Sequence, residues 1–191
     1  MDRIQLGQRD LLTTSLESDQ PPYTPWYQLD WDPQTGLRFQ VGCCKKPDNF
    51  IAQSNPKGFT EELWKHDVGE LFIKHTNSDA YLEINLAPHA AWWACLFSGY
   101  REPASASDSS PFEPVAIQPV SLTSDSWESH ITIPSMFLLE HLGFGSDSRM
   151  NVCFILGSPN KRHHFSRAHL PHDPPDFHHP SDFVPMMATE D

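Results

Sequence analysis

Basic residues are scarce in this sequence. It has 13 lysines and arginines against 25 aspartates and glutamates, which gives a formal net charge of −12. A surface of this sign repels phosphate backbones and anionic lipid headgroups, so we expect neither nucleic acid nor a membrane as partner. Long apolar runs are also missing, because no stretch reaches the ~20 residues that a membrane-spanning helix needs.

Cysteine is scarce as well, and its spacing fits no metal or redox motif. The four cysteines (Cys43, Cys44, Cys95 and Cys153) form no C-x-x-C pair, and three of them lie in apolar stretches. A free cysteine in such a stretch behaves as a small hydrophobic residue, so we expect four reduced thiols. Residues 1–6 lack the basic and apolar regions of a signal peptide, and we therefore expect a cytoplasmic location.

Common catalytic motifs are absent too. The sequence has neither a G-x-S-x-G nucleophile motif nor a glycine-rich phosphate loop. Glu70 and Glu83 would fit the carboxylate pair of a glycosidase if they lay on neighbouring strands. Acidic β-sandwiches offer many such pairs, so we predict no catalytic residues and a protein that is not an enzyme.

The sequence does contain many short segments with strand character. Three segments alternate between apolar and polar residues, as strands with one buried face do: 37–43, 81–86 and 127–133. Three others are apolar at nearly every position and predict central strands covered on both faces: 68–73, 90–100 and 151–157. Turn-forming residues separate them at short intervals, which predicts an all-β fold, an antiparallel β-sandwich.

One short helix interrupts the strand pattern. Residues 136–142 follow Ser135, which we expect to cap the helix, and Gly143 supplies a left-handed end. The helix would be a crossover between strands.

The predicted sandwich occupies residues 35–185. Residues 1–34 form an N-terminal extension with room for one edge strand, and residues 186–191 form a frayed tail. Residues 161–185 are rich in His, Pro and Asp, and we expect them to wrap the sheet as ordered coil.

Aromatic, carboxylate and amide side chains are concentrated between residues 64 and 100. Trp64 precedes Glu70 by six residues, and Glu83 and Asn85 share one face of the next strand. A sugar stacks its C–H face on an aromatic ring, while its hydroxyls bind carboxylates and amides. The pattern suits a saccharide site, but taken alone it is more often explained by a core position for Trp64 and by pairing of Glu70 with Arg101 or a backbone amide.

A longer pattern surrounds these residues. After Trp64 come Asp-Val-x-Glu-x-Phe-Ile (67–73) and Tyr-x-Glu-x-Asn-x-x-Pro (81–88), and a closing segment spans residues 175–183. This order resembles the family 9 carbohydrate-binding modules and the related DOMON-like domains over roughly residues 35–184. The resemblance implies a jelly-roll-like β-sandwich that clamps a saccharide end between two aromatic rings.

The resemblance also implies roles for individual residues. Trp64 would be one ring of the clamp, and Phe177, with His178 beside it, would close the far side. Glu70, Glu83 and Asn85 would bind the hydroxyls. The sequence departs from the pattern in two places, because Glu83 replaces a basic residue of sugar-binding members and Phe177 replaces a second tryptophan.

Other ligands remain open at this point. Six of the eleven histidines lie close together in the sequence: His163, His164, His169, His172, His178 and His179. Their irregular spacing favours loop hydrogen bonds over a zinc or copper site. Asp147 is one candidate ligand for calcium, but the sequence shows no clear partners for it.

DOMON-like relatives include haem-binding domains, for which His75, Met136 and Met150 are candidate axial ligands. A protein partner is a further alternative, with Trp92, Trp93 and Tyr100 as an exposed contact patch. We expect no cofactor and a small-molecule saccharide as ligand.

Overall fold

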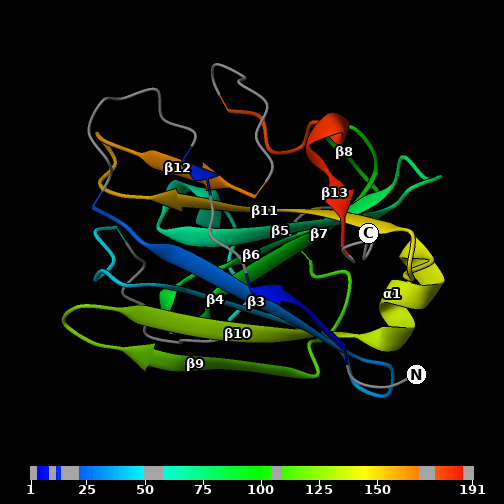
Figure 1. Ribbon diagram of the computed structural model, residues 1–191, viewed down its shortest axis with the longest axis horizontal. Helices are drawn as coiled ribbons and strands as arrows, with labels where there is room; N and C mark the ends of the chain where they lie inside the picture. Colours follow the sequence, from blue (N-terminus) through cyan, green and yellow to red (C-terminus); the bar gives the residue numbers. More distant parts are fainter. Residues whose placement is uncertain are drawn as a thin grey trace.

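Two antiparallel sheets face each other in this protein, which confirms the predicted all-β sandwich (Figure 1). The computed structural model describes six stretches of the chain: 4–8, 12–13, 22–49, 58–104, 109–167 and 175–186. No helix in the described residues is long and apolar enough to cross a membrane.

The first sheet has five strands. In spatial order they are β1 (Ile4–Gln8), β3 (Pro25–Asp32), β4 (Gly36–Cys43), β10 (Trp127–Pro134) and β9 (Ala116–Leu122). Strand β3 lies inside this sheet and buries Tyr27, Leu29 and Trp31 in the core. The sandwich therefore begins before the expected boundary at residue 35, which falls in the turn between β3 and β4.

The second sheet has eight strands. Along its main path these are β2 (Leu12–Thr13), β12 (His163–Ser166), β11 (Ser148–Leu156), β5 (Val68–His75), β6 (Tyr81–Leu86), β7 (Trp92–Gly99) and β8 (Glu102–Pro103), and β13 (Val184–Pro185) pairs with β11. The three predicted central strands are β5, β7 and β11, and each has a strand on both sides. Their apolar composition fits this position, because both faces are covered.

Apolar side chains form two layers rather than one. The layer between the sheets contains Leu71, Leu82 and Ile84 from the second sheet and faces Leu29 and Phe39 from the first. A second cluster lies on the outer face of the eight-stranded sheet: Leu63, Val68, Phe72, Tyr81, Ala87, Ala91, Trp93, Cys95, Phe97, Cys153, Phe177 and Phe183.

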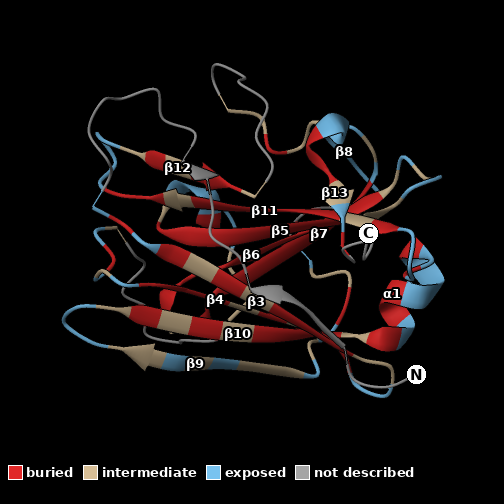
Figure 2. Ribbon diagram, in the orientation of Figure 1, coloured by how far each residue is buried: buried red, intermediate tan, exposed pale blue. Residues whose placement is uncertain are grey.

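This second cluster corrects an expectation about β6. All six residues of the strand are buried, although alternation predicts one wet face (Figure 2). Residues 175–186 cover that face, with Phe183 packed against Phe72 and Tyr81 at ring distances of 6.2 and 5.9 Å. Met186 is buried in the inner core, so the predicted tail does not begin at residue 186.

The C-terminal region also contains more regular structure than ordered coil. It forms β12, β13 and the 3-10 helix η3 (Pro180–Asp182). Two other 3-10 helices lie earlier in the chain, η1 (Leu63–Lys65) and η2 (Pro88–Ala90).

The predicted helix is α1 (Ser135–Leu142). Gly143 ends it with φ 57°, as expected. The predicted cap is wrong, because Pro134 occupies the N-cap position and no side chain caps the helix. Ser135 is instead the first helical residue and is buried.

The four cysteines are free thiols. Cys43, Cys95 and Cys153 are buried, and Cys44 is exposed. Burial raises the pKa of Cys43 and of Cys95 to about 11, which keeps both thiols protonated.

Candidate functional site

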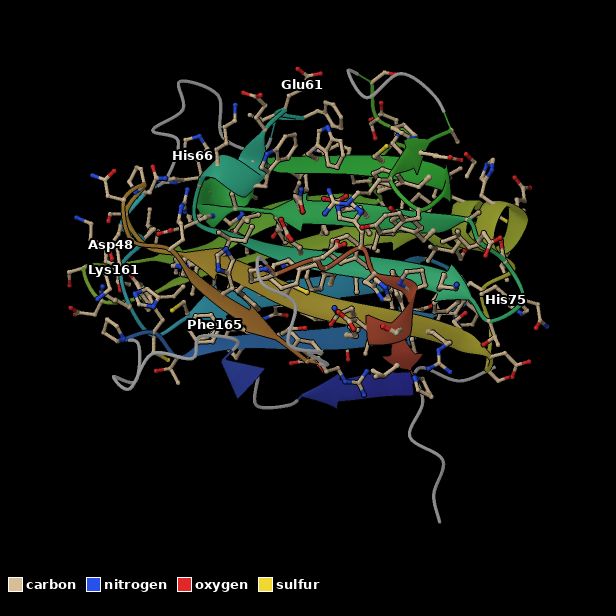
Figure 3. The ribbon with its side chains drawn as sticks, turned by 90° about the horizontal axis from the view of Figure 1, so that it is seen from above. Asp48, Glu61, His66, His75, Lys161 and Phe165 are labelled. Carbon is tan, nitrogen blue, oxygen red and sulfur yellow. The ribbon has the colours of Figure 1, made fainter. Side chains whose placement is uncertain are left out.

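A pocket of about 430 Å³ lies on the outer face of the eight-stranded sheet. Figure 3 looks onto this face and shows the C-terminal segment, with β13, lying across the strands. Side chains from η1, the central strands and residues 175–178 line the pocket. The sheet supplies a rigid floor, and the two short segments supply the walls.

Strand register places two carboxyls on this floor. Glu70 pairs with Asn85 across β5 and β6, and Phe72 pairs with Glu83. Glu70 and Glu83 are therefore diagonal neighbours on one face of the sheet. They are only 3 % and 5 % exposed.

The two carboxyls favour protonation. Burial and the neighbouring charge of Glu83 raise the pKa of Glu70 well above its usual range. Burial raises the pKa of Glu83 to about 7, against the opposing effects of a hydrogen bond from Asn85 and the charge of Arg101. Two like charges this close do not both ionise readily, so the pair retains a proton near neutral pH.

Few donors reach these carboxyls. Asn85 Nδ2 donates to Glu83 Oε1 at 3.0 Å. Among the described residues, none donates a hydrogen bond to Glu70. The buried Oδ1 of Asn85 also lacks a partner within the described part of the chain.

His178 lies beside the pair and is neutral. Its Nδ1 is 2.7 Å from Tyr81 Oη, and its Nε2 is 3.5 Å from Glu83 Oε2. Burial lowers the pKa of His178 to about 4, and the charge of Arg101 adds to this effect. A neutral ring with its proton on Nε2 satisfies both contacts, because Tyr81 can then donate to Nδ1.

Arg101 joins the sheet to the C-terminal segment. Its guanidinium donates to Asp176 Oδ1 at 2.9 Å, and the hydroxyl of Tyr100 donates to the same carboxylate. The backbone of Arg101 has φ 56°, an uncommon conformation for a non-glycine residue. The ion pair predicted as an alternative, Glu70 with Arg101, is wrong, because Asp176 binds the guanidinium.

Aromatic rings form the walls. Trp64 is 41 % exposed and meets Trp93 edge-on, with ring centroids 5.7 Å apart. Phe177 lies on the C-terminal segment with its ring centroid 6.0 Å from that of His164. The alternative that placed Trp64 in the core is therefore wrong.

Five of the six predicted site residues line this pocket: Trp64, Glu70, Glu83, Phe177 and His178. The sixth, Asn85, is buried and holds the Glu83 carboxyl instead of lining the pocket. The prediction missed Trp93, Phe97 and Arg101. Strand parity could have found the first two, because they share a face of β7; the ion pair of Arg101 crosses 75 residues and leaves no local signal.

The predicted protein-contact patch does not form. Trp92 and Trp93 are both 5 % exposed, because Trp92 packs in the inner core and Trp93 in the outer cluster. Tyr100 is exposed, as predicted.

The candidate haem ligands lie in different environments. Met150 is fully buried between the sheets, while Met136 is 61 % exposed on α1. His75 lies at the end of β5, where its Nδ1 accepts a hydrogen bond from the backbone of Asn77. This arrangement does not aim the three side chains at one cavity.

Candidate metal ligands are similarly dispersed. The described residues contain no cluster of three His, Cys, Asp or Glu side chains suited to a metal. His163 lies against Tyr23, and His179 bonds to Ser181. His169 and His172 lie outside the described residues. Asp147 accepts a hydrogen bond from Thr76 through its backbone oxygen.

Sequence comparison with known proteins finds a relative of low identity. No model of a known protein family matches the chain. The UPF0462 protein C4orf33 homolog of Rattus norvegicus is 28 % identical over 157 residues, which cover 79 % of this chain and 73 % of the rat protein.

A solved structure shares the architecture. It is that of a "putative carbohydrate-binding protein" from Bacteroides uniformis ATCC 8492, with a TM-score of 0.68 and 15 % identity. The likeness covers 93 % of this chain and 84 % of that one. At this identity it establishes a shared fold.

Proposed function

We propose that this protein is a non-catalytic carbohydrate-binding module that takes the end of a saccharide into the pocket beneath residues 175–186. The Bacteroides protein of the same fold, named for carbohydrate binding, supports this proposal. The pocket volume of about 430 Å³ also lies within the ~300–1,000 Å³ typical of small-molecule sites.

One juxtaposition carries the proposal: an exposed tryptophan beside two buried carboxyls. An exposed indole ring in a pocket wall offers a flat apolar surface for the C–H face of a sugar ring. The carboxyls of Glu70 and Glu83 offer acceptors for its hydroxyls, on strands that fix their positions. Trp93 meets Trp64 edge-on and fixes the inner side of the wall.

The first test is calorimetric titration of a panel of mono- and disaccharides into the wild type and Trp64→Ala. We expect the variant to lose at least tenfold in affinity, or about 1.4 kcal/mol, because the stacking surface is gone. Its melting temperature should change by less than about 2 °C, since Trp64 is substantially exposed.

A matched control is Trp26→Ala. Trp26 is a half-buried tryptophan that packs over Gly42 on the outer face of the other sheet. This variant should bind as the wild type does. Unchanged affinity in Trp64→Ala would refute the stacking role, and no binding of any saccharide by the wild type would overturn the function. Cleavage of a disaccharide during the titration would show an enzyme instead.

A further inference from the structure

The polar groups of the pocket are unbalanced in charge. Among the described residues that line it, Glu70 and Glu83 are the acids and Arg101 is the permanent cation. Asp176 binds the guanidinium of Arg101 and offsets part of the positive charge that Arg101 extends toward the two glutamates. His178 contributes no charge, because its lowered pKa keeps it neutral at pH 7.

The floor is also short of hydrogen-bond donors. Glu70 is only 3 % exposed, lines the pocket and receives no hydrogen bond from any described residue. Buried acceptors without donors are costly and rare, so we expect a ligand to supply the missing donors.

A protonated amine on the ligand would supply the missing hydrogen-bond donors at Glu70 better than a hydroxyl would. A hydroxyl offers one donor and no charge, whereas an ammonium offers three donors and a full positive charge that favours ionisation of both carboxyls. The aromatic walls at Trp64 and Phe177 favour the same choice, because a cation is attracted to the face of an aromatic ring. The net charge of −12 attracts cationic ligands from a distance.

We propose that the pocket selects saccharides with a free, protonated amine, whose ammonium group binds at Glu70 and Glu83. This proposal rests on the saccharide function proposed above and narrows it to amino sugars without an N-acyl group.

Proton release should accompany binding. The empty pair retains a proton near neutral pH, and a bound ammonium stabilises both carboxylates, so the proton leaves. The other titratable or charged groups that face the pair are the neutral His178 from the C-terminal segment, Arg101 after β7, Tyr81 on the strand of Glu83, Cys95 on β7 and Cys153 on β11. Burial raises the pKa of Cys153 well above its usual range, so this thiol keeps its proton near pH 7. Burial raises the pKa values of Tyr81 and Cys95 to about 12 and 11, so neither exchanges a proton near pH 7.

The experiment is calorimetric titration near pH 7 with glucosamine and galactosamine, beside glucose, galactose and N-acetylglucosamine. Each titration is run in phosphate and in MOPS, two buffers that differ in ionisation enthalpy. We expect at least one amino sugar to bind tenfold or more tightly than its neutral parent, and N-acetylglucosamine to bind no better than glucose. The enthalpy of the amino sugar should differ between the buffers in the direction of proton release.

Two variants test whether Glu70 and Glu83 cause the preference for the amine. Glu83→Gln and Glu70→Gln keep the shape of the side chain and remove its charge, so each should reduce the preference for the amine at least tenfold. Glu128→Gln is the matched control, a half-buried glutamate on the outer face of the other sheet that binds Gln40, and it should keep the preference. Melting curves confirm that each variant folds.

The outcomes separate the two proposals. Neutral sugars that bind as tightly as amino sugars would overturn the amine selectivity and leave the saccharide function in place. A preference for the amine that survives both glutamate variants would also overturn it. If no saccharide of either kind binds, the proposed function itself fails.

Discussion

Glu83 is a residue whose protonation should be visible in the stability of the whole protein. Its pKa rises from an ordinary 4.5 to about 7 because burial disfavours the charge. Between these two pH values the folded protein holds a proton that the unfolded chain has released. The stabilising contribution is therefore complete below about pH 4.5 and is lost as the pH rises through about 7.

We expect Glu83→Gln to become more stable than the wild type as the pH increases. The glutamine keeps an acceptor for Asn85 and carries no charge to bury. The shift corresponds to at most about 3 kcal/mol, so the difference in melting temperature should grow by roughly 5 °C between pH 5 and pH 8. Parallel thermal melts across this range measure it.

The difference between variants is the informative quantity. His178 contributes with the opposite sign, because its pKa is lowered to about 4 and its contribution to stability rises between about pH 4 and pH 6.5. That contribution is common to both proteins and largely cancels in the comparison. A difference in melting temperature between Glu83→Gln and the wild type that stays constant from pH 5 to pH 8 would contradict a buried, perturbed carboxyl.

At the scale of elements, β6 shows what the sequence could and could not predict. Its alternation correctly assigned Leu82, Ile84 and Leu86 to one face and Glu83 and Asn85 to the other. The burial of the second face was not predictable, because the cover comes from residues 175–186, about 90 positions later in the chain.

Some residues of the candidate site could also be predicted from the local sequence, and others could not. Trp64 and Glu70 were accessible to prediction because they lie only six positions apart, on η1 and β5. The placement of Phe177 and His178 beside them came from a resemblance in the order of motifs. No local rule places Arg101 in the pocket, since its position depends on a turn and on a distant aspartate.

The C-terminal segment should act as a cover whose attachment controls the pocket. Phe183 is buried against Phe72 and Tyr81, and the same segment carries Phe177 and His178 to the pocket. We expect Phe183→Ala to cost about 3–5 kcal/mol and to weaken binding of any saccharide that the wild type binds. Hydrogen exchange should increase in residues 175–186.

A matched variant separates a local effect from a general loss of stability. Phe144 is also a buried phenylalanine, but it packs against Trp31 at the inner core, with ring centroids 4.6 Å apart. Phe144→Ala should lose stability and keep wild-type affinity at a temperature where it is folded. Equal loss of affinity in both variants would show that the cover has no specific role.

At the scale of the whole molecule, the fold depends on pattern more than on residue identity. The Bacteroides protein keeps the architecture at 15 % identity. Two layers of apolar residues, one between the sheets and one under the C-terminal segment, determine which face of each strand is buried. The surface charge is free to vary on such a frame, and here it is strongly negative.

That charge should make stability depend on salt. At pH 7 the net charge of −12 repels itself, and ~0.2 M salt screens this repulsion over distances beyond about 7 Å. We expect the melting temperature to rise by about 3 °C between ~20 mM and ~200 mM sodium chloride. Near pH 5.2, the isoelectric point of the sequence, the rise should vanish because the net charge is close to zero. An equal rise at both pH values would instead indicate binding of a specific ion, and potassium chloride in place of sodium chloride would then identify which ion is responsible.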